Sequence, residues 1–138
     1  MRKGLSREVV AEAALAVAHE ESLERISIRQ VAAHLGVVPS ALYGHIEDRF
    51  DIYRAMAEVA YTRLAHTMAL AAHDEPDPVE RLRTILRTYY RFAAQDRLQF
   101  RVLTRFRPQF SNEWSSDQLP AGSSALEIIT DAVHSTMN

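Results

Sequence analysis

Between two stretches with helical spacing, residues 36–46 read GVVPSALYGHI. Gly36 follows the last apolar residue of a helical stripe, where glycine tolerates the left-handed backbone that ends a helix. Pro39 suits the first turn of a new helix, because its missing N–H would have no partner there. The segment therefore predicts a helix, a tight turn and a second short helix. This pattern is typical of a helix-turn-helix, whose second helix fits the major groove of DNA.

Helical stripes flank this turn on both sides. Ser6 can cap a first helix with apolar residues at i, i+3, i+4 and i+7, and Ser27 with Gln30 forms a capping box for the next. Asp48 caps a longer helix, which the prolines of HDEPDP (73–78) end. Further helices are expected from about Val79, through RLQFRVLTRF (97–106) and in ALEIITDAVHSTM (125–137), with SNEWSSDQLPAGSS (111–124) as a loop. Without any alternating strand pattern or internal repeat, the fold class is all-α.

Periodicity also indicates which faces of these helices are buried. The inner stripe of the long helix is expected to hold Tyr53, Met56, Ala57, Ala60, Leu64, Thr67, Met68 and Ala71. The apolar side of the helix that follows is expected to hold Leu82, Leu86, Tyr90 and Ala93.

Composition excludes several classes of protein. With 138 residues, 47% of them hydrophobic and 25% charged, the chain is of ordinary globular type. It contains no cysteine, which excludes disulfides and thiolate zinc sites. Arg7, Glu8 and Glu12 interrupt the apolar run that a signal peptide would need, and no run is long enough to span a bilayer. We therefore expect a cytoplasmic protein without a membrane segment.

Charge is nearly balanced overall, at −2, but unevenly distributed. Residues 1–54 carry seven basic and eight acidic side chains, so a basic face there must arise from placement rather than from composition. Residues 80–107 carry eight arginines opposed by Glu80 and Asp96. In this segment arginines recur every four residues in a first row, Arg83, Arg87 and Arg91, and in a second, Arg97, Arg101 and Arg105. Each row is interpreted as a solvated face that pairs with acids elsewhere, or alternatively as a site for an anionic effector or partner.

Residues 6–57 resemble the N-terminal domain of the TetR family of transcriptional repressors. The matching stretches are SREVVAEAALAVA (6–18), ISIRQVAAHLGV (26–37) and ALYGHIEDRFDIYRAM (41–56). The resemblance implies a three-helix helix-turn-helix domain over residues 1–47. A helical effector-binding and dimerisation domain would follow over 48–138, starting with a linking helix at about 48–72. The family usually ends with two long helices that pair between subunits, and we expect this C-terminal region to be incomplete here.

The resemblance also implies roles for individual residues. Ser27 matches a capping and phosphate-contact position, and Arg29 matches a position that reaches a guanine edge in some members. Base-facing positions correspond to Pro39, Ser40 and Ala41, whose small side chains suit thymine methyl groups. Tyr43 and His45 match positions that touch the DNA backbone or nearby bases, and Arg49 matches a phosphate-binding lysine.

Simpler interpretations of three of these side chains stay open. Tyr43 would be a core residue, His45 a polar surface residue and Arg29 a solvated arginine.

The chain departs from the family pattern at several positions. Val38 stands where a serine or threonine often caps the recognition helix, so that cap is lost. Gly44 replaces a larger side chain and costs roughly 1 kcal/mol of helix stability. Glu47 and Asp48 place acids where some relatives carry bases.

Aromatic residues gather in the second half, where the family holds its small-molecule pocket and dimer surface. An aromatic stripe more often belongs to a core, but Phe92, Phe106, Phe110 and Trp114 are candidates to line the pocket. Phosphate loops, nucleophile elbows and HExxH motifs are absent, and His66 and His73 lack a third ligand at a metal-like spacing. An enzyme, a catalytic residue, a metal site and a bound cofactor are therefore not expected.

These features together predict a ligand-responsive repressor of the TetR type. It would bind a palindromic double-stranded DNA operator as a homodimer and be released by a small-molecule effector. The alternative is a helical interaction or ligand-binding module that has kept the fold but lost DNA binding.

Overall fold

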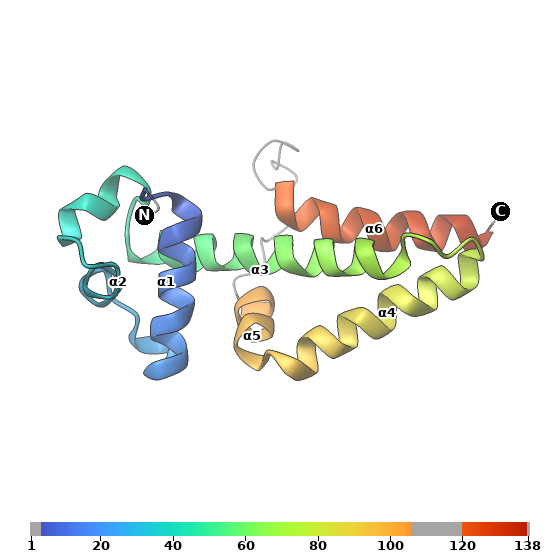
Figure 1. Ribbon diagram of the computed structural model, residues 1–138, viewed down its shortest axis with the longest axis horizontal. Coiled ribbons are helices and arrows are strands. Elements are labelled where there is room, and N and C mark those ends of the chain that lie inside the picture. The colour runs from blue at the N-terminus through green and yellow to red at the C-terminus, as the bar shows by residue number, and fades with distance from the viewer. Residues whose placement is uncertain (1–3, 106–119, 138) are drawn as a thin grey trace.

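The computed structural model describes residues 4–105 and 120–137, with side chains from residue 128 onward in the second range. Within these ranges every regular element is a helix, where η marks a 3-10 helix: α1 (Arg7–Glu20), η1 (Leu23–Arg25), α2 (Ile28–Leu35), η2 (Pro39–Gly44), α3 (Arg49–Ala72), α4 (Pro78–Gln95), α5 (Arg97–Arg105) and α6 (Pro120–Met137). The predicted all-α fold is confirmed. The long α3 is the axis of the molecule, with the helix-turn-helix unit at its first half and α4 and α6 along its second half (Figure 1).

The elements up to the first half of α3 enclose one hydrophobic core. Its largest fully buried side chains are Leu23, Ile26, Leu42, Ile52 and Met56, each less than 2% exposed. Val10, Ala14, Val31 and Ala32 of α1 and α2 fill the space between them, as the helical stripes predict. Val102 of α5 completes this core, although it lies in the second half of the sequence.

A second core lies between the second half of α3 and the three helices that follow. It contains Leu64 and Met68 of α3, Ile85 of α4, Leu103 of α5 and Ala132 of α6. Because α3 contributes to both cores and α5 reaches into the first, the two regions are packed into one continuous body. The predicted division into 1–47 and 48–138 stays a prediction.

The predicted helix starts are confirmed at three serine and aspartate caps. The Ser6 hydroxyl accepts a hydrogen bond from Val9 N at 3.1 Å, and Asp48 Oδ1 accepts one from Asp51 N at 2.8 Å. Ser27 and Gln30 form a reciprocal capping box. Each cap satisfies N–H groups that have no partner inside the first turn of a helix.

The predicted inner face of α4 is wrong at two positions. Ile85 is the buried residue, whereas Leu86 and Tyr90 are 50% and 73% exposed. Apolar side chains occupy two adjoining sides of this helix, and periodicity alone does not say which side packs. On α3 the stripe is correct except at Thr67 and Ala71, which are exposed.

Three further elements differ from expectation. Residues 120–124, predicted as loop, lie in α6, which begins at Pro120 because proline is compatible with a first helical turn. The single turn η1, whose Leu23 is buried, was not predicted. The short helix after the turn is confirmed, but it is a 3-10 helix rather than an α-helix.

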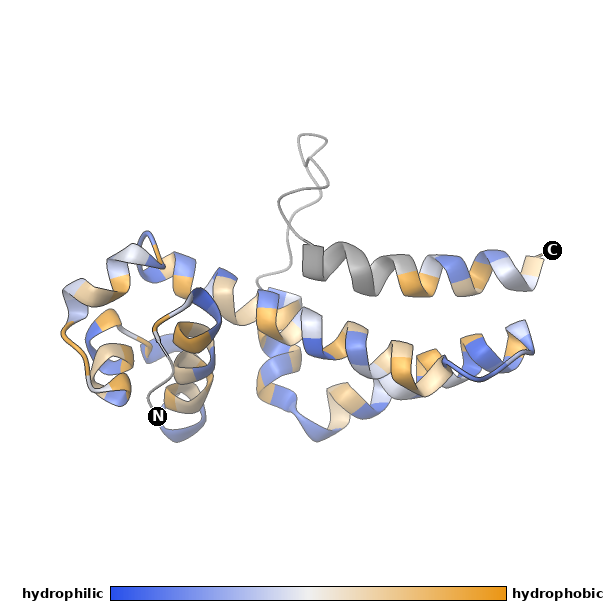
Figure 2. Cartoon of the chain, turned by 45° about the horizontal axis from the view of Figure 1, so that its top comes forward, coloured by the Kyte–Doolittle hydropathy of each residue, from blue (hydrophilic) through white to orange (hydrophobic). Residues whose placement is uncertain are grey.

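Hydropathy follows the packing of the helices. Figure 2 shows polar and apolar residues on both α3 and α4; α4 is amphipathic, whereas α3 contributes buried side chains to both cores. Among the residues that the structure describes, no helix combines the length and the apolar character needed to cross a membrane.

Candidate nucleic-acid interface

The turn between α2 and η2 is built around Gly36. Its φ of 69° lies in the left-handed region, where a residue with a Cβ is strained. The Gly36 N–H donates to Ala33 O at 3.1 Å and the Val37 N–H donates to Ala32 O at 3.0 Å, which satisfies the last carbonyls of α2. The chain then reverses through extended Val38 into Pro39.

The helix η2 is held by hydrogen bonds three residues apart. Ala41 N–H donates to Val38 O at 3.0 Å, and His45 N–H donates to Leu42 O at 2.9 Å. Val38 makes no side-chain cap hydrogen bond, as its apolar side chain predicts. A missing cap and Gly44 at the last position both weaken an α-helix, which accounts for the tighter 3-10 turn.

This helix has one anchored side and one exposed side. Leu42 is fully buried and Ile46 is 2% exposed, so both side chains fix η2 on the first core. Ser40 and Tyr43 lie on the same outer side, three residues apart, and Tyr43 is 55% exposed. Pro39 is also exposed, while Ala41 and His45 are half-buried. Tyr43 is therefore not a core residue.

The two candidate residues of α2 differ in their surroundings. Ser27 uses its hydroxyl to accept from Gln30 N at 3.1 Å, so its capping role is observed. Arg29 is exposed and forms no hydrogen bond or ion pair with any residue of the described ranges. The guanidinium group of Arg29 is thus exposed and unpaired among the residues that the structure describes.

Arg49 has an internal role that the sequence did not indicate. Its Nε donates to Ile26 O and its Nη2 donates to Glu24 O, both at 2.8 Å. Tyr53 adds a hydrogen bond from its hydroxyl to Leu23 O at 2.8 Å. The first turns of α3 therefore hold η1 and the residues leading to the cap of α2. The predicted phosphate contact of Arg49 would have to use the remaining edge of its guanidinium.

The helix α5 also contacts the η1 turn. Glu24 Oε1 forms ion pairs with Arg101 at 2.5 Å and with Arg105 at 3.1 Å. The pKa of Glu24 is lowered, first by a backbone hydrogen bond and then by Arg101. The sequence separations of 77 and 81 residues place these contacts beyond any local pattern.

A further ion-pair cluster surrounds Arg7, in the first turn of α1. Arg7 contacts the carboxylates of Asp51 at 2.7 Å and Glu58 at 2.8 Å. The hydrogen bonds from Arg7 hold the pKa of Asp51 below its ordinary value, aided by the Glu47 N–H and against the effect of burial. Sequence reasoning missed this cluster, because its members are 44 and 51 residues apart.

The candidate effector region lies only partly within the described residues. Phe92 is half-buried and packs against the second core. Phe106, Phe110 and Trp114 lie outside the described residues, so their role stays a prediction. Tyr89 and Phe100 make an edge-to-face contact, with ring centroids 6.1 Å apart, that joins α4 to α5.

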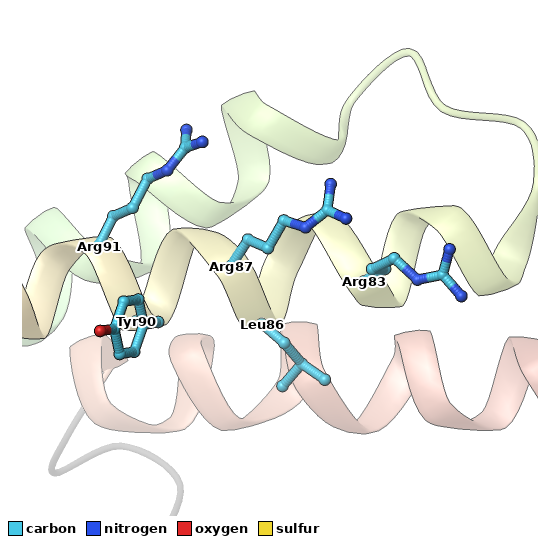
Figure 3. A pocket seen from close by; sticks show the side chains of 5 residues that line it. All are labelled: Arg83, Leu86, Arg87, Tyr90 and Arg91. Atoms are coloured by element: carbon cyan, nitrogen blue, oxygen red, sulfur yellow. The ribbon is translucent and has the colours of Figure 1, made fainter.

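The arginine row of α4 faces solvent. Together with Leu86 and Tyr90 it lines an open depression of about 380 Å³, and the three guanidinium groups extend along one side of the helix (Figure 3). Arg83 pairs with Glu80 at 2.7 Å, whereas Arg87 and Arg91 meet no acid in the described ranges of the chain. The interpretation as a face that pairs with acids elsewhere therefore holds for Arg101 and Arg105, whereas the acid that pairs with Arg83 lies on α4 itself.

Over the described ranges no three or more His, Asp or Glu side chains are grouped so that they could hold a metal ion.

Comparison with curated proteins gives distant relatives. No family model matches the chain. The nucleoid occlusion factor SlmA of Vibrio vulnificus (strain YJ016) is 25% identical over 99 residues, which cover 72% of this chain and 50% of that protein. SlmA of Edwardsiella ictaluri (strain 93-146) is 31% identical over 81 residues, covering 59% of this chain and 41% of its own length. The chain thus spans half or less of the length of these relatives.

Solved structures are similar over nearly the whole chain. A TetR family transcription regulator from Marinobacter aquaeolei VT8 has a TM-score of 0.67 at 21% identity, covering 94% of this chain and 66% of that one. SCO0253, a TetR-family transcriptional regulator from Streptomyces coelicolor, has a TM-score of 0.63 at 21% identity, covering 99% and 71%. A protein of unknown function from Rhodococcus sp. RHA1 has a TM-score of 0.71 at 22% identity, covering 97% and 70%. The resemblance seen in the sequence is borne out, and the fold is that of the TetR-family regulators.

Proposed function

We propose that this chain, which has the fold of the TetR-family regulators, is a cytoplasmic repressor that binds a palindromic DNA operator as a homodimer. The observation that carries the proposal is the two-sided character of η2. Buried Leu42 and Ile46 fix this helix on the core, while Ser40 and Tyr43 remain on the outside. A short convex element of this kind, braced by α2, suits the major groove.

The remaining candidate residues would make different kinds of contact with DNA. Arg29 has a guanidinium without a partner in the described ranges and would read a guanine edge through its two parallel N–H groups. Pro39, Ser40 and Ala41 would contact thymine methyl groups, while Tyr43 and His45 would contact the sugar-phosphate backbone. In a homodimer, two such elements would enter successive major grooves about 34–36 Å apart.

The proposal also includes release from DNA by a small-molecule effector. The effector would bind among α4, α5 and α6, where Phe92 lies. The helix α5 contributes Leu103 to the core of that bundle and Val102 to the core of the helix-turn-helix unit. Arg101 and Arg105 of α5 also form ion pairs with Glu24 of η1, the turn that precedes α2. A displacement of α5 would therefore shift the population of DNA-binding arrangements.

Selection of bound duplexes from random DNA by the full-length protein tests the proposal. Enrichment of a palindrome is expected, and Arg29→Ala or Tyr43→Ala should abolish it. Arg87→Ala is the matched control, because Arg87 is also exposed and lacks an acidic partner in the described ranges, but lies on α4. It should leave the enriched sequence unchanged.

A helical interaction module without DNA binding is the alternative. The acids Glu47 and Asp48, both exposed beside η2, favour it because they repel phosphate. Absence of any enriched duplex at every ionic strength would support this alternative and contradict the repressor.

A further inference from the structure

The guanidinium of Arg7 has an acceptor for each of its five N–H groups. Its Nε donates to Glu58 Oε2 at 2.8 Å, and its Nη2 donates to Asp51 Oδ1 at 2.7 Å and Glu58 Oε1 at 3.1 Å. The Nη1 group donates to Asp51 Oδ2 at 2.8 Å and to the backbone carbonyl of His45 at 3.3 Å. Arg7 therefore binds two carboxylates by paired hydrogen bonds and still holds one main-chain oxygen.

These acceptors belong to two elements of the recognition unit. Asp51 and Glu58 lie in the first three turns of α3, whereas His45 is the residue that ends η2. Arg7 itself begins α1. One side chain thus ties the start of α1, the start of α3 and the end of the candidate recognition helix to one another.

Asp51 extends the same connection to the next peptide groups. Its Oδ2 accepts from Glu47 N at 2.8 Å, and its side chain is 7% exposed. Residues 45–47 are consequently held at two points, the His45 carbonyl by Arg7 and the Glu47 amide by Asp51. This short segment joins η2 to α3, and its Ile46 is buried in the first core.

A lysine at position 7 could not reproduce this arrangement. Its single ammonium has three donors and no planar fork, so it cannot form paired hydrogen bonds with both carboxylates and keep a fifth donor for the carbonyl. The geometry depends on arginine rather than on positive charge alone.

We propose that Arg7 is a positioning residue for DNA recognition: through Asp51 and the His45 carbonyl it sets the orientation of η2, without touching DNA. This inference rests on the proposed function. It assigns a role in specificity to a residue that lies outside the helix-turn-helix turn itself.

The test compares R7K with R63K, in the full-length protein. Arg63 and Glu12 form another ion pair between α3 and α1, at 2.7 Å, but away from η2. Affinity is measured for the enriched duplex and for a scrambled duplex at several salt concentrations, and amide hydrogen exchange is measured without DNA.

R7K should weaken binding to the enriched duplex by roughly tenfold or more. Its affinity for the scrambled duplex and the salt slope should match wild type, because no phosphate contact is lost. The Glu47 amide should exchange faster in R7K than in wild type. R63K should change the affinity for the enriched duplex by less than about twofold.

Several results would overturn the inference. One is unchanged affinity of R7K for the enriched duplex, and another is an equal loss of affinity for the enriched and the scrambled duplex, which would indicate a direct contact with the DNA backbone. If R7K does not fold, D51N takes its place with the same expected loss of specific affinity. If the wild-type protein enriches no duplex, the proposed function fails. Arg7 then still positions residues 45–47 if the Glu47 amide exchanges faster in R7K than in wild type. Unchanged exchange at Glu47 refutes that role.

Discussion

At the scale of single residues, the structure gives several side chains two tasks. Arg49 matches a phosphate-binding position in sequence, yet its guanidinium holds the carbonyls of Glu24 and Ile26. Asp51 lies in the first turn of α3, where an acid favours the helix dipole, and is also the acceptor for Arg7. Local spacing identifies the caps, but it cannot identify partners that are 23 to 44 residues away.

Asp51→Asn should lower the free energy of unfolding by roughly 1.5–3 kcal/mol at neutral pH, because charge-assisted hydrogen bonds are lost. The pKa of Asp51 is lowered in the folded state, so this stabilisation is present above its unfolded pKa of about 4 and is lost as pH falls through the folded pKa. Urea unfolding of both proteins from pH 2.5 to 8 checks this. The difference between them should be constant above about pH 5 and shrink below about pH 4. The lowered pKa of Glu24 acts equally in both proteins and cancels.

Arg49→Lys should keep the positive charge but lose the two carbonyl contacts of the planar fork. The free energy of unfolding is expected to fall by about 1–2 kcal/mol in chemical denaturation. Arg54→Lys is the control, since Arg54 is 65% exposed and lies 4.0 Å from Asp51. Equal stability of the two variants would show that the contacts of Arg49 contribute nothing measurable.

At the scale of elements, the sequence predicts where helices begin and end better than what kind of helix forms. Gly36 marks the end of α2 and the Ser27–Gln30 box marks its start, both as expected. The region from Val38 to Gly44 was expected to form a short helix, and it does so as a 3-10 turn. The missing cap at Val38 and the glycine at position 44 disfavour an α-helix there, and the anchoring of Leu42 and Ile46 in the core adds a tertiary effect that local patterns do not show.

The two glycines that border this region allow a matched test. A Cβ at either Gly36 or Gly44 would meet no atom within 4 Å, but only Gly36 among the described glycines has a positive φ. Gly36→Ala should therefore destabilise the fold by about 1 kcal/mol, and Gly44→Ala should stabilise it by about 0.4–1 kcal/mol. Thermal unfolding monitored by circular dichroism distinguishes them. Shifts of equal sign in the unfolding temperatures of the two variants would contradict the left-handed backbone conformation of Gly36.

The inner side of α4 is a second test at this scale. Ile85→Ala should cost about 2–5 kcal/mol, because it removes a buried side chain and leaves a cavity. Leu86→Ala, one position along, should cost less than about 1 kcal/mol, since Leu86 is half exposed. Denaturant midpoints of the two variants compare them directly. A larger loss of stability for Leu86→Ala than for Ile85→Ala would mean that the Leu86 side of α4 packs against the core, as periodicity predicted.

At the scale of the whole molecule, α3 joins the two cores and α5 contacts both of them (Figure 1). Amphipathic stripes were enough to predict an all-α chain with a helix-turn-helix at one end. They could not predict that Glu24 would meet Arg101 and Arg105, or that Arg7 would join three elements, because these contacts arise only once the helices are packed. Eight DNA-contact candidates came from the resemblance at fixed positions, and their roles stay predictions.

The proposed function depends on η2 being a DNA-recognition element in a dimeric repressor. The most direct test is a fluorescence anisotropy titration of the full-length protein against the enriched palindrome and a scrambled duplex, from about 50 to 200 mM salt. Binding to the palindrome should be about a thousandfold tighter or more, and both affinities should fall steeply as salt rises. Equal affinity for the two duplexes, or binding that does not respond to salt, would contradict the assignment of η2 as a DNA-recognition element.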